Sequence, residues 1–321
     1  MSLPTKVDIV EVGTRDGLQN EKTYITPEDK IRLLDTITDA GVRRIEVTSF
    51  VSPKHVPQLR DAQEVLAGCK RSPDAEYEAL VPNVRGMERA LECELDGVML
   101  FVAASETFNL KNIRASRKEM LGVAREVARM ALDAGLKLRG GVVATFGCPY
   151  EGRISYEDVE WVVGEYVDMG CAEIGLADTV GMSNPAEIKR LTSHIRDKFP
   201  SVRYALHLHN TRGAGLANLL AGLEVGVDTF DTSPLRAPRH RQHRERGHDQ
   251  HAPRDGGRDR CRPAETPGSR RPRGENPGSP ASGATPPRRH PRMGNGVLRR
   301  FRRMEHARAA YGVVEKAGLG S

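Results

Sequence analysis

Eight short apolar segments recur at regular intervals along residues 1–233, and this repetition constrains the fold more than any other feature. Most are rich in Val, Ile and Leu, which is the composition of strands covered on both faces of a parallel sheet. We expect strands at residues 7–13, 44–50, 77–83, 97–105, 138–146, 172–178, 203–209 and 227–233.

The stretches between these segments carry the start and stop signals of helices. In one of them, Thr26 can cap the helix, Pro27 suits its first turn, and Gly41 is a typical end. Another repeats the pattern from Ser155 to Gly170. Eight strands separated by seven helical stretches predict an α/β fold, the (β/α)8 TIM barrel. A doubly wound open sheet is the competing architecture, but the polar residues at the strand ends also favour the barrel.

The composition changes abruptly after Ser233. Residues 1–233 hold 28 Lys and Arg against 35 Asp and Glu, a balance of −7. Residues 234–321, called the tail below, hold 21 against 8, a balance of +13, and are rich in Pro and Gly. Because such a tail cannot build an apolar core, we expect a barrel at 1–233 whose final helical part is missing or replaced by a disordered tail. Its charge also makes it a candidate nucleic-acid-binding segment.

Polar residues stand at the ends of several predicted strands, where a barrel builds its active site. His207 and His209 are two residues apart on one strand, so their side chains share a face. With Asp16, which follows the first strand, they form a set of nitrogen and oxygen ligands suited to Mg²⁺ or Mn²⁺. A His-x-His pair alone is more often structural, but this combination at one end of a barrel favours a metal site.

Other polar residues allow more than one role. Arg15 can stabilise a developing enolate or oxyanion, or can form an ordinary salt bridge to Glu46 that would also orient it. Asp178, at the end of the sixth strand, can be a base, a partner of another site residue, or a helix cap. Cys148 is interpreted as a small residue in a turn, because no histidine is near it in the sequence.

The cysteines and the N-terminus bear on the compartment. The five cysteines lie far apart and form no Cys-x-x-Cys pair, which argues against a disulfide framework. The opening MSLPTKVDIV shows neither a secretion signal nor a transit peptide, and the chain has no run of 18 apolar residues. We therefore expect a cytoplasmic protein without a membrane partner.

Several motifs taken together resemble 3-hydroxy-3-methylglutaryl-CoA lyase, of the DRE-TIM metallolyase superfamily. They are VEVGTRDGLQNEK, IEVTSFVSPKHVPQ, FGCPYEGRIS, GLADTVGMSNP and HLHNTRGAGLANLLAGLEVGV, and the match spans residues 6–233. RDGLQNE, SFVSPK and CPYEG are specific to the lyase branch, because the related synthases that condense an acyl-CoA with a keto acid typically read RDGEQ.

The resemblance implies a TIM barrel that cleaves 3-hydroxy-3-methylglutaryl-CoA to acetyl-CoA and acetoacetate, in leucine degradation and ketone-body formation. It implies Mg²⁺ or Mn²⁺ as the cofactor, with Asp16, His207 and His209 as ligands, and a contact between Lys22 and CoA. The catalytic residues that it implies are Arg15, Asp16, Glu46, Asp178 and His207. The expected partner is an acyl-CoA, and a homodimer is left open. The alternative is a related lyase that acts on a different 3-hydroxyacyl-CoA.

The resemblance ends with Asp-Thr-Ser at residues 231–233. The family continues with a glycine loop that carries a catalytic thiol, and then with Ala-Thr-Gly-Asn, whose Asn is a further metal ligand. The tail has neither, but codons for residues 234–242 restarted at their second base can encode Pro-Phe-Ala-Pro-Arg-Ala-Thr-Gly-Asn. We therefore interpret the tail as out-of-frame translation and expect this chain to be impaired. A genuine nucleic-acid-binding tail, the alternative, does not explain the hidden reading.

Overall fold

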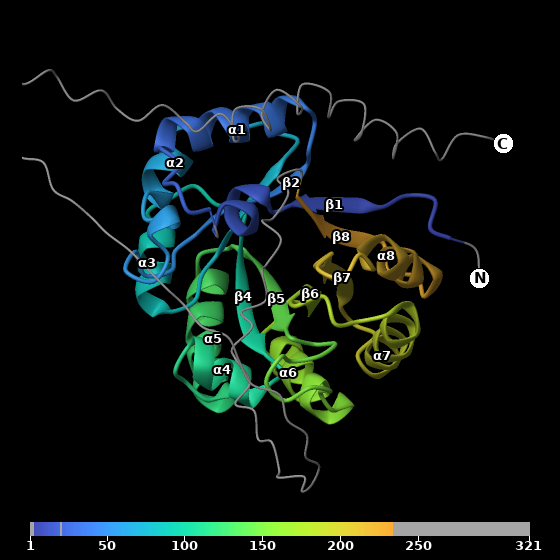
Figure 1. Ribbon diagram of the computed structural model, residues 1–321. Coiled ribbons are helices and arrows are strands. Elements are labelled where there is room, and N and C mark those ends of the chain that lie inside the picture. Colours follow the sequence, from blue (N-terminus) through green and yellow to red (C-terminus); the bar gives the residue numbers. More distant parts are fainter. Residues whose placement is uncertain (1–2, 20, 234–321) are drawn as a thin grey trace, which may run out of the picture. The chain divides into compact units, whose positions relative to one another are not determined.

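The protein forms a closed barrel surrounded by helices. The computed structural model describes residues 3–19 and 21–233. In these ranges, eight parallel strands follow one another around the barrel in chain order, and the helices lie outside them (Figure 1). The (β/α)8 architecture predicted from the sequence is confirmed. The predictions made for the tail, its disorder and its altered frame, lie outside the described residues.

The eight strands coincide with the eight predicted segments, although most end earlier. They are β1 (Asp8–Glu11), β2 (Arg44–Ser49), β3 (Glu76–Leu80), β4 (Gly97–Ala103), β5 (Lys137–Val143), β6 (Glu173–Asp178), β7 (Arg203–Leu208) and β8 (Thr229–Thr232). The early ends leave polar residues in the loops at the C-terminal side of the barrel, where active sites of this fold lie.

Eight α-helices are present in the described residues, one more than the seven expected. They are α1 (Pro27–Asp39), α2 (Ala62–Gly68), α3 (Val84–Ala90), α4 (Glu106–Asn112), α5 (Arg117–Asp133), α6 (Tyr156–Asp168), α7 (Pro185–Lys198) and α8 (Gly215–Glu224). The additional helix is α4. Its N-cap is Ser105, whose hydroxyl accepts a hydrogen bond from the Phe108 N–H at 2.9 Å.

The predicted helix caps form as expected. The Thr26 hydroxyl accepts a hydrogen bond from the Asp29 N–H at 3.3 Å, and the Ser155 hydroxyl accepts one from the Asp158 N–H at 3.1 Å. Each cap satisfies a backbone donor that the first helical turn leaves unpaired. None of the helices described is long and apolar enough to cross a membrane.

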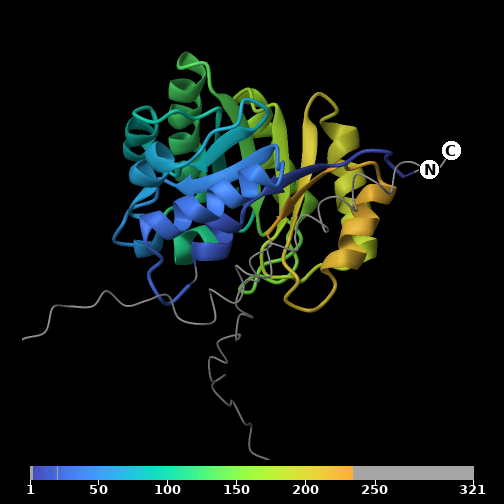
Figure 2. The ribbon, with the colours of Figure 1, turned by 90° about the horizontal axis from the view of Figure 1, so that it is seen from above.

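The apolar core lies between the strands and the helices, which flank the barrel in a second view (Figure 2). Leu33 and Leu34 of α1 and Tyr166 of α6 are among its fully buried side chains. Their burial removes apolar surface from water and stabilises the contact of each helix with the sheet.

The barrel interior, by contrast, contains charged side chains. Arg44 of β2 contacts Glu173 of β6, and Arg139 of β5 contacts Asp231 of β8. These strand pairs are not neighbours in the barrel, so the contacts cross its interior. Branched apolar residues usually fill this space in TIM barrels. The strands are covered on both faces, as their composition indicates, but the inner face also carries paired charges.

Gly140 of β5 tests how tightly the outer layer is packed. A Cβ atom there would lie 2.6 Å from Cδ2 of Tyr166, a rigid and fully buried ring. We expect Gly140→Ala to lower the free energy of unfolding by about 1–3 kcal/mol through overpacking. Urea unfolding followed by circular dichroism measures the change.

Gly122 in α5 provides the matched control, because apart from its chain neighbours and the backbone of its own helix no atom of the described residues lies within 4 Å of the Cβ position there. Gly122→Ala should raise the free energy of unfolding by about 0.5–1 kcal/mol, since alanine is the better helix former. Equal effects of the two substitutions would contradict the packing argument.

Candidate active site

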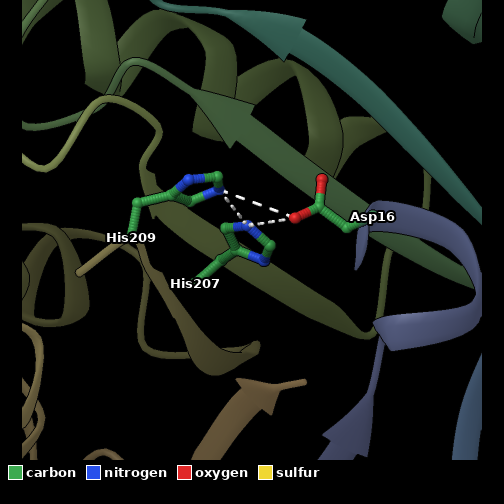
Figure 3. Close-up of side chains that lie close together, drawn as sticks. All are labelled: Asp16, His207 and His209. Atoms are coloured by element: carbon green, nitrogen blue, oxygen red, sulfur yellow. Dashed lines mark hydrogen bonds and ion pairs between the residues drawn. The ribbon is translucent and has the colours of Figure 1, made fainter. Parts of the chain in front are cut away.

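Asp16, His207 and His209 meet at the C-terminal end of the barrel (Figure 3). The two histidine Nε2 atoms are 3.0 Å apart, and Asp16 Oδ2 lies 3.9 Å from Nε2 of His207 and 3.7 Å from Nε2 of His209. The three candidate ligand atoms all lie within 4.8 Å of one another. Two imidazole nitrogens and a carboxylate oxygen so placed suit one divalent cation with room for further oxygen ligands.

A single π-helical turn, η1 (Gly13–Gly17), presents the carboxylate of this cluster. The turn follows β1 directly, and the Asp16 N–H donates to the Val12 carbonyl at 2.7 Å. The π-type hydrogen bond runs from the Gly17 N–H to the Val12 carbonyl at 3.4 Å, and such turns are frequent at functional sites. It brings both Asp16 and the buried Arg15 to the mouth of the barrel.

Arg15 is held by two carboxylates. Its Nε and Nη2 atoms donate to Glu46 at 2.5 and 3.2 Å, and Nη1 donates to Asp16 Oδ1 at 2.9 Å. Burial opposes the charge of the guanidinium, but the attraction of Glu46 and Asp16 raises the pKa of Arg15. Burial also opposes ionisation of Asp16, but Arg15 and the two histidines lower its pKa. The salt bridge to Glu46 considered from the sequence is present, and it fixes the orientation of a permanent cation beside the cluster.

His207 has a buried partner, Asp231, that was not predicted from the sequence. Its Nδ1 atom lies 2.9 Å from Asp231 Oδ2, and Arg139 donates to Asp231 Oδ1. Burial works against both charged groups, but the arginine and the imidazole lower the pKa of Asp231, and the Asp231 carboxylate raises the pKa of His207. The sequence offered one signal for this pair: Arg139 and Asp231 are charged residues within the mostly apolar segments that form β5 and β8. Charged side chains are rarely buried unless they are paired.

Asp178 lies at the end of β6 with both carboxylate oxygens engaged by the following turn. The N–H groups of Met182 and Ser183 donate to Oδ1 and Oδ2 at 2.8 and 3.1 Å. Burial raises the pKa of Asp178, and these hydrogen bonds oppose the rise. The carboxylate thus stabilises the β6–α7 turn, while the His209 N–H donates to the Asp178 carbonyl at 3.3 Å. A role in catalysis stays a prediction.

Cys148 occupies a structured turn, as predicted from the sequence. Its backbone exchanges hydrogen bonds with Gly152 at 2.8 Å in both directions, and its fully buried thiol lies 3.0 Å from the Ser105 hydroxyl. These contacts join the loop after β5 to the start of α4. The four cysteines within the described residues are all free thiols.

Lys22 lies exposed on the loop between η1 and α1. Gln58 holds this loop, because its side-chain amide donates to the carbonyls of Glu21 and Thr23 at 2.7 and 2.6 Å and accepts from the Ile25 N–H at 3.1 Å. The loop is thereby fixed on both sides of Lys22. The predicted contact of Lys22 with CoA stays a prediction.

Comparison with known proteins identifies the family of this site. The HMGL-like family model matches residues 6–235. The chain belongs to the HMGL-like family. It is 45% identical over 233 residues to the 3-hydroxy-3-isohexenylglutaryl-CoA/hydroxy-methylglutaryl-CoA lyase of Pseudomonas aeruginosa, covering 73% of this chain and 78% of that lyase. It is 44% identical to the human mitochondrial hydroxymethylglutaryl-CoA lyase, covering 72% of this chain and 71% of the human protein.

A solved structure extends the comparison to the fold. The HMG-CoA lyase of Acinetobacter baumannii, in complex with coenzyme A and 3-methylmalate, superimposes with a TM-score of 0.69 at 40% sequence identity. The match covers 73% of this chain and 76% of that one. The sequence comparison and the structural comparison therefore indicate the same family.

The cluster predicts a measurable affinity for a divalent cation. Replacing a residue that hydrogen-bonds to a metal ligand typically lowers metal affinity by about 10–100-fold. Replacing a ligand itself should lower the affinity at least as much. We expect His209→Ala to weaken Mn²⁺ binding by at least about tenfold. Electron paramagnetic resonance of free Mn²⁺ during a titration measures the change.

His194→Ala is the matched control, because His194 lies on α7 and pairs with Glu160 of α6. This variant should bind Mn²⁺ as the unchanged chain does. Unchanged binding by His209→Ala would contradict the proposed ligand set.

Proposed function

We propose that this barrel is a hydroxymethylglutaryl-CoA lyase that cleaves 3-hydroxy-3-methylglutaryl-CoA to acetyl-CoA and acetoacetate with the help of Mg²⁺ or Mn²⁺. The observation that carries the proposal is the placement of Arg15 directly beside the cluster of Asp16, His207 and His209. The names of the relatives support the same reaction class, a carbon–carbon lyase acting on an acyl-CoA.

The reaction needs help at two points of the substrate. The tertiary hydroxyl must lose its proton before the bond between C2 and C3 breaks, and negative charge then develops on the thioester oxygen of the departing acetyl-CoA enolate. A bound divalent cation lowers the pKa of a hydroxyl that it contacts. Asp16, His207 and His209 are the residues that would hold it.

Arg15 meets the second requirement. Its guanidinium is fixed by Glu46 before the reaction, so it can stabilise the enolate oxygen without reorganising. Nη1 donates to Asp16 Oδ1 at 2.9 Å and so places this positive charge beside the cluster. Glu46 would thus act by positioning Arg15, and the catalytic roles implied for both residues stay predictions.

The residues after 233 decide how active this chain is. By the family resemblance, that part should supply a thiol that transfers a proton and an Asn ligand. We infer that the barrel at 1–233 is the catalytic domain and that the tail is an out-of-frame continuation without these groups. The tail is not proposed as a nucleic-acid-binding segment.

A comparison of two chains tests the proposal. A chain with the reading frame restored after Ser233 should cleave the substrate when Mg²⁺ or Mn²⁺ is added. The present chain should be slower by about 10²–10⁴-fold, the usual cost of losing one general acid or base. Acetoacetate release, assayed at equal concentrations of folded protein, measures both.

Two outcomes would contradict this account. Equal turnover of the two chains would show that the groups after Ser233 are dispensable. Absence of turnover by the restored chain would contradict the proposed reaction. The second substrate to assay would then be 3-hydroxy-3-isohexenylglutaryl-CoA, because the Pseudomonas aeruginosa relative is also named for it.

We also propose a cellular compartment and a source of the substrate. The four free thiols of the described residues suit a reducing compartment, and we place the protein in the cytoplasm. Leucine degradation would supply the proposed substrate. A homodimer stays a prediction that gel filtration can test.

A further inference from the structure

His207 is bound at both of its ring nitrogens, and the two partners are of different kinds. Nδ1 lies 2.9 Å from the Asp231 carboxylate, whereas Nε2 faces His209 Nε2 at 3.0 Å and Asp16 Oδ2 at 3.9 Å. A carboxylate only accepts hydrogen bonds, so a neutral His207 ring must carry its proton on Nδ1. Nε2 then carries no proton, and its lone pair points into the cluster.

Asp231 is itself fixed from the opposite side of the barrel. Its side chain is 1% exposed, and Arg139 of β5 donates to Oδ1 while Oδ2 faces His207. Each carboxylate oxygen thus has its own partner. A carboxylate present only to neutralise Arg139 would not need its second oxygen to face a candidate metal ligand.

Arg139 is positioned by a row of charges that crosses the barrel. Its Nε atom lies 2.8 Å from Glu173 Oε1, and the Glu173 carboxylate accepts two hydrogen bonds from Arg44 at 2.9 and 3.1 Å. Arg44 also donates to Glu78 at 3.0 Å. The row begins on β3 and β2, continues through β6, β5 and β8, and ends at His207 of β7. Buried charges are costly unless they are paired, so every member constrains the next.

We propose that Asp231 is a positioning residue that fixes the tautomer and orientation of His207 for metal binding, and that Arg139 holds Asp231 in place. The inference rests on the proposed metal-dependent function and adds residues that act only through His207. Carboxylate partners of metal-binding histidines commonly act in this way.

Asp231→Asn in the full chain tests the proposal. The amide is nearly the same size but can face His207 with either its oxygen or its NH₂ group, so the tautomer is no longer imposed. We expect Mn²⁺ affinity to fall by about 10–100-fold. Nitrogen-15 NMR of the histidine rings, at a pH where they are neutral, should show the proton on Nδ1 of His207 in the unchanged chain and a mixture of tautomers in the variant.

Asp228→Asn is the matched control. Asp228 lies three residues away, just before β8, is about half exposed, and pairs with Arg203 at 3.7 Å. The same chemical change there should leave Mn²⁺ affinity and the His207 tautomer unaltered. If Asp231→Asn does not fold, as judged by circular dichroism, Arg139→Lys replaces it as the variant, because lysine keeps the charge but cannot contact Glu173 and Asp231 with one planar group.

The readouts separate this inference from the proposed function. A neutral His207 ring protonated on Nε2 in the unchanged, metal-free chain would overturn the inference whether or not metal binds. Wild-type Mn²⁺ affinity in a folded Asp231→Asn variant would overturn it as well. Failure of the unchanged chain to bind Mn²⁺, with the proton on Nδ1, would instead refute the metal-dependent function and leave the positioning of His207 supported.

Discussion

Pairing between β1 and β8 is the interaction on which the candidate site depends. It joins opposite ends of the described chain, from Asp8 opposite Thr229 to Glu11 opposite Thr232. The Val12 N–H donates to the Thr232 carbonyl at 2.8 Å and carries the pairing to the residue that precedes the π-helical turn. Closure therefore sets η1 beside β8 and within reach of β7. Without it, the carboxylate from the start of the chain would not face the two histidines.

The paired charges inside the barrel explain why the side chains of the site have one fixed arrangement. Apolar side chains in a barrel can repack with little loss, whereas buried charges need a particular partner in a particular direction. Arg139 and Glu173 are each nearly inaccessible and contact one another. Removing Arg139 would take away the buried cation that faces both Glu173 and Asp231. Burying these charges costs desolvation free energy, but it fixes the positions of the side chains below the site.

The proposed chemistry is divided along the chain. The described barrel contains the groups that would activate the substrate hydroxyl and stabilise the enolate, which are the cluster of Asp16, His207 and His209 and the neighbouring Arg15. The family resemblance assigns a proton-transferring thiol and a further ligand to the part after Ser233. A change of reading frame after Ser233 would therefore remove the proton-transferring thiol and one metal ligand, while Arg15, Asp16, His207 and His209 stay in the barrel.

The sequence by itself determined the barrel, the eight strands and the identities of the candidate ligands. Apolar periodicity, helix caps and the spacing of His207 and His209 are local properties, so they can be read without coordinates. Asp231 was not identified, because its role exists only where β8 passes His207 and meets Arg139 from β5. The charged interior and the π-helical turn were likewise decided by tertiary structure. Which face of a strand turns inward, and which distant charge it meets there, is fixed only when the barrel closes.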